Sequence, residues 1–117
     1  MPTITIYLKP TCTTCRSAYK LLQEAGVNFD TVDYYVEPIP KVKLQELLKK
    51  MGIPARALLR TKEPLYADLD LKEKQLSEEE VIDLMIKYPD LIQRPIVEQG
   101  AKAILARPPE RLNWEIL

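Results

Sequence analysis

Two cysteines separated by two residues constrain this chain more than any other feature of its sequence. They lie in the segment Lys9-Pro10-Thr11-Cys12-Thr13-Thr14-Cys15-Arg16, which follows an apolar run at 4–8 and precedes an amphipathic helical pattern. A thiol at the start of a helix faces unpaired backbone N–H groups and the positive end of the helix dipole, which stabilise a thiolate. The sequence therefore predicts a reactive thiol, redox-active or able to attack an oxyanion, at a strand-to-helix junction.

Charge and cysteine content exclude several classes of function. The 117 residues contain 17 Lys and Arg against 17 Asp and Glu, so no net field favours nucleic acid or an anionic membrane. No apolar run approaches the roughly 20 residues of a spanning helix, and the N-terminus lacks a signal peptide pattern, so we expect a cytoplasmic protein. With two Cys and no His, the chain lacks the four ligands of a structural zinc site and the base of Cys–His catalysis, so we expect no metal.

The hydrophobic pattern predicts an α/β fold. A strand at 3–8, a helix from Thr13 to about Ala25 and a strand at 27–35 form a β-α-β unit with parallel strands. A β-hairpin at 94–105 and a last helix at 110–117 form the other end of the chain. Between them, we expect helices at 42–51, 55–60, 64–71 and 78–88, the last opened by a capping box at Ser77.

This order of elements is that of a thioredoxin-like fold with a helical insertion at about 38–90. We expect a mixed four-stranded sheet in a single domain of residues 1–117, and a monomer. A C-x-x-C at the first strand–helix junction is typical of such folds. Pro95, at the start of the first hairpin strand, is then expected to face the cysteine loop and to follow a cis peptide bond.

Further motifs give the chain a strong resemblance to a known family. They are Ile4-Thr5-Ile6-Tyr7 before the Cys12 loop, Gly52-Ile53 followed by Arg56-Ala57-Leu58-Leu59-Arg60, then Arg94-Pro95-Ile96-Val97, and Arg107-Pro108. In this order they resemble the arsenate reductase (ArsC) family, a branch of the thioredoxin-like superfamily that also contains the Spx-type transcription regulators. The resemblance runs nearly from end to end.

The resemblance implies a set of site residues. Cys12 matches the cysteine that attacks arsenate, and Arg60, Arg94 and Arg107 match the three arginines that hold the oxyanion. The chemistry agrees, because arginine offers a planar fork of donors that stays charged. The loop and the first helical turn supply further donors in Thr11, Thr13, Thr14 and Arg16, and backbone amides there form a cradle for an anion.

The identity of the reductant stays open at this point. Reductases coupled to glutaredoxin usually carry Ser where this chain has Cys15, whereas Spx-like proteins carry the second cysteine but generally lack the full arginine set. We expect no tightly bound cofactor. We expect the electron donor to be either glutathione with glutaredoxin, or thioredoxin. Cys15 is a candidate resolving thiol, able to form a disulfide with Cys12.

Two other functions remain compatible with the sequence. The first is an Spx-like regulator that contacts RNA polymerase, without binding nucleic acid directly, and uses a Cys12–Cys15 disulfide as a redox switch. The second is a dithiol oxidoreductase without specificity for oxyanions. Without the resemblance, Arg94 and Arg107 would be taken for surface arginines. Tyr34 and Tyr35 are expected in the core or at its edge.

Overall fold

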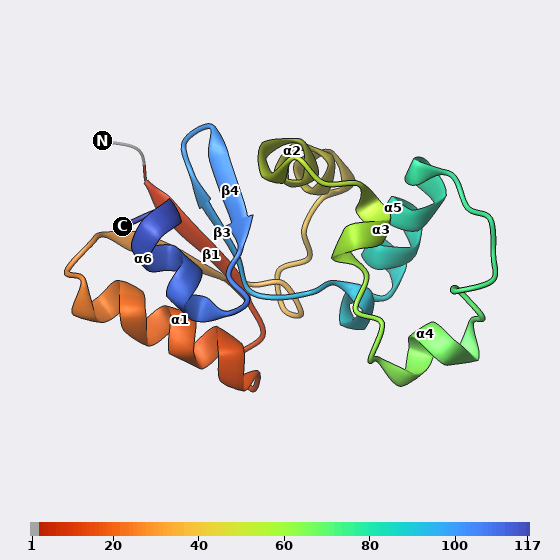
Figure 1. The fold of residues 1–117 in the computed structure, drawn as a ribbon, viewed down its shortest axis with the longest axis horizontal. Coiled ribbons are helices and arrows are strands. Elements are labelled where there is room, and N and C mark those ends of the chain that lie inside the picture. Colours follow the sequence, from red (N-terminus) through yellow and green to blue (C-terminus); the bar gives the residue numbers. More distant parts are fainter. Residues whose placement is uncertain (1–2) are drawn as a thin grey trace. The chain divides into compact units, whose positions relative to one another are not determined.

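The computed structural model describes residues 3–117. The chain divides into two compact units, and the first combines residues 3–37 with Arg94–Leu117. The second unit is Pro38–Gln93, which is largely helical. Figure 1 labels most of the helices and strands of both units. The first unit contains the sheet and the cysteine loop.

The first unit is built on a mixed four-stranded sheet in the order β2-β1-β3-β4. Its strands are β1 (Ile4–Leu8), β2 (Phe29–Asp33), β3 (Ile96–Gln99) and β4 (Lys102–Leu105). Strand β1 pairs in parallel with β2 and antiparallel with β3, and β3 pairs antiparallel with β4. This arrangement confirms the predicted β-α-β and β-β-α pattern, with β2 shorter than the strand expected at 27–35.

Helix α1 (Thr13–Glu24) follows the cysteine loop and covers one face of the sheet. Its buried residues Cys15, Ala18 and Leu22 recur at spacings of three and four, which places them on one face of the helix. They pack in one core cluster with alternate residues of β1, such as Ile6. Gly26, with φ +70°, follows the helix in the left-handed conformation that suits glycine after a helix end. The amphipathic pattern therefore determines which face of the helix packs against the sheet.

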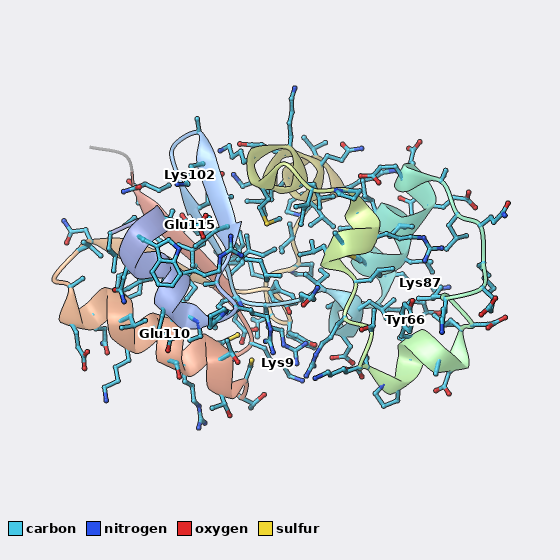
Figure 2. All side chains as sticks on the ribbon, in the orientation of Figure 1. Lys9, Tyr66, Lys87, Lys102, Glu110 and Glu115 are labelled. Atoms are coloured by element: carbon cyan, nitrogen blue, oxygen red, sulfur yellow. The ribbon has the colours of Figure 1, made fainter. Side chains whose placement is uncertain are left out.

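The C-terminal segment closes the same face of the sheet, in a form that differs from the predicted helix at 110–117. A 3₁₀ turn at Pro109–Arg111 leads into a short helix, α6 (Leu112–Glu115). Leu112 is fully buried against the core cluster, whereas Trp114 is exposed. The helix stops early because the N–H groups of the last two residues both turn back to the Leu112 carbonyl. Glu115, labelled in Figure 2, is held by the Arg111 guanidinium at 2.6 Å.

The second unit consists of short helices around its own apolar core. They are α2 (Lys41–Met51), α3 (Ala55–Leu58), α4 (Pro64–Asp68), α5 (Glu78–Lys87) and a 3₁₀ turn at Pro89–Leu91. The predicted capping box is confirmed, because Ser77 and Glu80 each bond the other's backbone N–H. Gly52 ends α2 with φ +68° and donates to Leu48. Among residues 3–117, no helix is long and apolar enough to cross a membrane.

Candidate functional site

Strand pairing brings three distant segments to one edge of the sheet. Antiparallel pairing of β1 with β3 places Tyr7 opposite Ile96, and pairing of β3 with β4 places Ile96 opposite Leu105. The cysteine loop leaves β1 at this edge, Arg94 precedes β3, and Arg107 follows β4. The register therefore gathers the loop and two of the three arginines at the same end of the first unit.

Cys12 occupies the N-cap of α1, with φ −82° and ψ 125°. Its backbone N–H donates to the Lys9 carbonyl at 3.0 Å, and its carbonyl accepts from Arg16 N at 3.0 Å. This pairing turns the chain sharply from the strand into the helix. The Cys12 side chain is partly exposed, and both cysteines are free thiols. The nucleophile predicted from the sequence therefore lies at a helix N-terminus, accessible to solvent.

The surroundings of Cys12 favour its thiolate. Burial raises the pKa of the Cys12 thiol, but hydrogen bonds from the Cys15 backbone and side chain, and the Arg94 guanidinium beside it, outweigh burial. The pKa falls from 9.0 to about 7. The Cys12 side chain forms no full N-cap hydrogen bond with any described residue. The Cys15 N–H therefore acts on the sulfur without that geometry. About half of the Cys12 side chains are therefore thiolates near neutral pH, as the sequence predicts.

Cys15 has the opposite character. It lies in the first turn of α1 with no exposed surface. Burial is the main cause that raises the pKa of Cys15, a backbone hydrogen bond from Lys9 opposes it, and the neighbouring Cys12 adds to the rise. The result is a pKa of about 12. The pair therefore consists of an accessible thiolate and a buried thiol that keeps its proton.

Arg94 is the most unusual side chain of the site, because it is a buried cation. Only 4% of its surface is exposed. Its Nε and Nη1 atoms are buried and have no hydrogen-bond partner among the described residues. Burial opposes the charge, but interactions with Tyr34, Cys12 and Tyr35 outweigh it and raise the pKa of the guanidinium. A buried, charged fork with two unused donors therefore lies beside the thiolate.

Arg107 is tied to the same corner. Its Nη1 donates to the Arg94 carbonyl at 2.9 Å, while most of the side chain remains exposed. The peptide bonds Arg94–Pro95 and Arg107–Pro108 are both cis, the first being the isomer expected from the sequence. Arg94 and Arg107 thus occupy equivalent places at the open end of the β3–β4 hairpin.

Arg60 belongs to the second unit. It follows α3, and its backbone N–H donates to the Leu91 carbonyl at 2.7 Å. Its guanidinium pairs with the Glu63 carboxylate at 3.3 Å. Of the three arginines named from the sequence, the first unit thus contains Arg94 and Arg107, and the second contains Arg60, engaged by a carboxylate.

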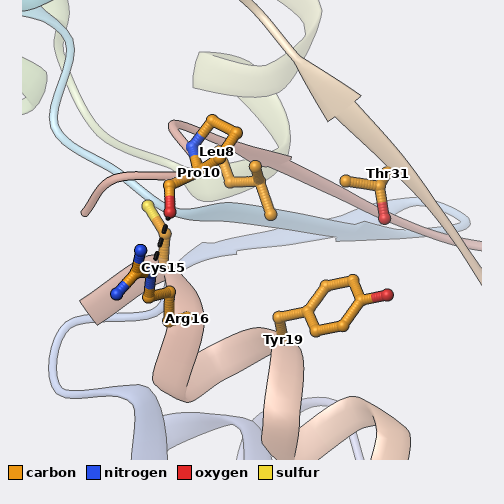
Figure 3. Close-up of a pocket in the computed structure, with 6 residues that line it drawn as sticks. All are labelled: Leu8, Pro10, Cys15, Arg16, Tyr19 and Thr31. Carbon is orange, nitrogen blue, oxygen red and sulfur yellow. Dashed lines mark hydrogen bonds between the residues drawn. The ribbon is translucent and has the colours of Figure 1, made fainter. Parts of the chain in front are cut away.

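The remaining loop residues lie around the thiol in different ways. Thr11 and Thr13 are exposed, and Thr14 is partly buried. Arg16 turns back, and its Nε donates to the Pro10 carbonyl at 3.0 Å (Figure 3). Arg16 thereby braces the loop.

A pocket of about 270 Å³ opens beside the loop. Its lining is mainly apolar and comes from the end of β1, the loop, α1 and β2: Leu8, Pro10, Cys15, Arg16, Tyr19 and Thr31 (Figure 3). Cys15 is one of these residues, although its side chain has no exposed surface.

Tyr34 lies in the core, as the sequence predicts, and also belongs to the surroundings of Arg94. It is almost fully buried, and its hydroxyl interacts with Arg94. Burial raises the pKa of Tyr34 so that the phenol remains protonated. Parallel pairing of Leu8 with Asp33 puts the residues after β1 and after β2 at the same sheet edge, and this is the signal that could have identified Tyr34.

Lys9 adds a further positive charge to this edge. Its Nζ lies 4.7 Å from the centroid of the Tyr35 ring, and Figure 2 labels it near the loop. Over residues 3–117 no group of three Cys, Asp or Glu side chains has the arrangement of a metal site. The chemistry available at this corner is therefore that of a thiolate, a second thiol and cationic donors.

Comparison with known proteins agrees with this geometry. A model of the ArsC family matches residues 7–113. The uncharacterized protein YfgD of Escherichia coli (strain K12) is 42% identical over 93% of this chain and 92% of its own length. An arsenate reductase of Yersinia enterocolitica is 42% identical over 94% of this chain and 78% of its own length.

A solved structure gives the same result for the fold. The arsenate reductase from Vibrio cholerae superposes with a TM-score of 0.92 at 34% identity, covering 99% of this chain and 98% of that protein. The similarity thus extends over both compact units and includes the cysteine loop, the hairpin and the helical segment. The chain has the thioredoxin-like fold and belongs to the ArsC family, whose arsenate reductases are oxidoreductases that use thiol chemistry.

Proposed function

We propose that this protein is a thiol-dependent arsenate reductase in which the Cys12 thiolate attacks arsenate. Arsenate is a tetrahedral anion at neutral pH, so its site needs several directed donors and positive charge. The first turn of α1 supplies backbone N–H groups, and Arg94 and Arg107 supply guanidinium groups beside them. Thr11, Thr13 and Thr14 are further donors on the loop.

The buried Arg94 guanidinium carries this proposal. Leaving two charged N–H groups buried without an acceptor costs roughly 1–3 kcal/mol or more for each. Here both groups lie in the side chain that stabilises the Cys12 thiolate. An anion that accepts these two hydrogen bonds is held next to the sulfur that attacks it. Arg60 joins the proposal through the family resemblance alone.

The chemical steps balance as a two-electron reduction. The Cys12 thiolate attacks As(V), an oxygen leaves as water after protonation, and a covalent As–S bond forms. A second thiolate then attacks the Cys12 sulfur, the As–S bonding pair remains on arsenic, and arsenic leaves as arsenite. The two thiols supply the two electrons and end as a disulfide.

The second thiol has two possible sources. In one route glutathione attacks Cys12, and glutaredoxin reduces the mixed disulfide. In the other route Cys15 attacks, and thioredoxin or glutaredoxin reduces the Cys12–Cys15 disulfide. Cys15 is poorly ionised, because burial raises its pKa and the neighbouring Cys12 thiolate adds to the rise. Formation of the As–S bond removes that thiolate, so arsenylation of Cys12 favours ionisation of Cys15.

A coupled assay tests the proposal and separates these routes. We expect arsenate-dependent NADPH consumption with a glutaredoxin or a thioredoxin system, abolished in Cys12→Ser. Arg94→Lys keeps the charge but loses the planar fork, so we expect kcat/KM for arsenate to fall at least about tenfold. Arg60→Lys and Arg107→Lys test the other two arginines in the same way. Absence of arsenate-dependent turnover with both reducing systems would refute the proposal.

The paired thiols also favour a second candidate, an Spx-like redox switch. Cys12 and Cys15 interact directly, as a reversible disulfide requires. A pull-down with the C-terminal domain of the RNA polymerase α-subunit, using oxidised and reduced protein, tests this function. Binding in one redox state only supports the switch, and no binding in either state contradicts it.

A further inference from the structure

We propose that Cys12 and Cys15 together form a binding site for trivalent arsenic, with both sulfurs bonded to one arsenic atom. The ligands are arsenite and monosubstituted arsenous acids. The proposal adds a second protein ligand to the arsenic. Because binding requires no reduction of arsenate, it can be tested independently of the proposed reductase function.

The geometry of α1 places the two sulfurs together. Cys12 is the N-cap and Cys15 is three residues further on, and in this arrangement an N-cap side chain reaches toward the third residue of the helix. The Cys15 backbone and side chain both interact with the Cys12 sulfur. Neither cysteine is in a disulfide. Cys15 is also one of the residues that line the pocket of Figure 3.

A site with two thiol ligands suits trivalent arsenic better than zinc. Structural zinc normally takes four ligands, and the described residues contain no group of three Cys, Asp or Glu that could complete such a site. Trivalent arsenic forms three bonds in a pyramid and prefers sulfur, as soft thiophilic elements do. Two thiols and one oxygen or carbon substituent complete its valence.

Arg94 is placed to donate a hydrogen bond to the third substituent of bound arsenite. After two thiols have bound, arsenite retains one hydroxyl group, which carries lone pairs. The Arg94 side chain lies beside Cys12 and has two buried N–H groups without an acceptor among the described residues. We infer that the arsenic hydroxyl accepts a hydrogen bond from Arg94, so the same guanidinium serves the bound As(III).

The binding reaction is a condensation without a redox change. Arsenite, As(OH)₃, reacts with the two thiols to give a dithioarsenite with one As–OH group and two molecules of water. Arsenic remains As(III), two As–S bonds replace two As–O bonds, and the two thiol protons leave in the water. A monosubstituted arsenous acid reacts in the same way and retains its As–C bond.

Phenylarsine oxide and arsenite are suitable probes for the reduced protein. We expect mass spectrometry under native conditions to show one arsenic per chain and, after unfolding, the loss of both titratable thiols. We expect dimercaptopropanol to release the arsenic and glutathione, at the same thiol concentration, to release little, because a dithiol matches the chelate. These measurements use the unaltered chain, so they do not depend on a variant that folds.

Variants then assign the bonds. Cys15→Ser and Cys12→Ser each leave one sulfur, and we expect each to weaken binding of both probes by about 100-fold or more, the gain typical of two linked contacts. Circular dichroism confirms that each variant is folded. Equal binding by wild type and Cys15→Ser, equal release by glutathione and dimercaptopropanol, or two arsenic atoms per chain would overturn the proposal.

Discussion

Arg94 offers the sharpest test of how this site activates its thiol. The pKa of Cys12 is about 7 instead of 9.0, because the hydrogen bonds from Cys15 and then the Arg94 guanidinium, as a donor and as a charge, outweigh burial. That difference corresponds to about 2.7 kcal/mol in favour of the thiolate. Hydrogen bonds to charged groups contribute about 1.5–3 kcal/mol. Arg94→Met, which keeps the volume but removes the charge and the donors, should therefore raise the pKa of Cys12 by about one to two units.

The assay is alkylation of Cys12 by iodoacetamide as a function of pH, with thiolate absorbance near 240 nm as an independent measurement. At pH 7 the thiolate fraction should fall from about half to a tenth or less, so alkylation should slow at least about fivefold. Cys15 contributes little, because it is buried and its pKa is about 12.

Arg107→Met is the matched control, since it removes a guanidinium from the same corner. Arg107 donates to the Arg94 backbone, and its charge is not among the main causes that set the pKa of Cys12. We therefore expect a clearly smaller change in the pKa for this variant. If Arg94→Met still titrates near 7, or if both variants shift equally, the helix N-terminus rather than Arg94 activates the thiol.

Three further predictions follow from the structure. Cys15→Ser should leave the pKa of Cys12 nearly unchanged, because a hydroxyl can still donate, whereas Cys15→Ala should raise it; alkylation profiles compare the two. Because folding lowers the pKa of Cys12 from 9.0 to about 7, stability should increase from pH 7 to pH 9, by about 1–2 kcal/mol after solvent screening, and Cys12→Ser should lose this increase in urea denaturation. Gly52→Ala should lower the free energy of unfolding by about 1 kcal/mol, because φ is +68° while no described atom lies within 4 Å of the new methyl group, and thermal melting measures it.

Local patterns allowed most of the fold to be predicted from the sequence. The spacing of Cys15, Ala18 and Leu22 identified α1 and its buried face, and Ser77 with Glu80 marked the start of α5. These signals are local, because each depends on residues within one or two helical turns. The last helix was predicted too long, since its end depends on where the chain turns back to Leu112.

The site was predictable in composition but not in its electrostatics. The family resemblance named Arg94, yet nothing within the sequence indicates that this arginine is buried with two donors unused. Tyr34 was assigned to the core for the same reason. Its contact with Arg94 joins residues sixty positions apart, and it arises from the register of β2, β1 and β3. Burial and contact at this sheet edge are properties of the assembled sheet, which local patterns do not contain.

The burial of Arg94 supports the anion site that we propose at this corner. A buried arginine usually has its donors satisfied, because unpaired charged groups lower the free energy of unfolding. Here the Cys12 thiolate compensates the charge in part and the neutral Tyr34 hydroxyl is a hydrogen-bond partner, while Nε and Nη1 remain unpaired within the described chain. An apolar residue at this position would remove that cost and with it the charge that holds the thiolate. The arrangement therefore gives up stability at the place where an oxyanion would restore it, as expected for a preorganised anion site.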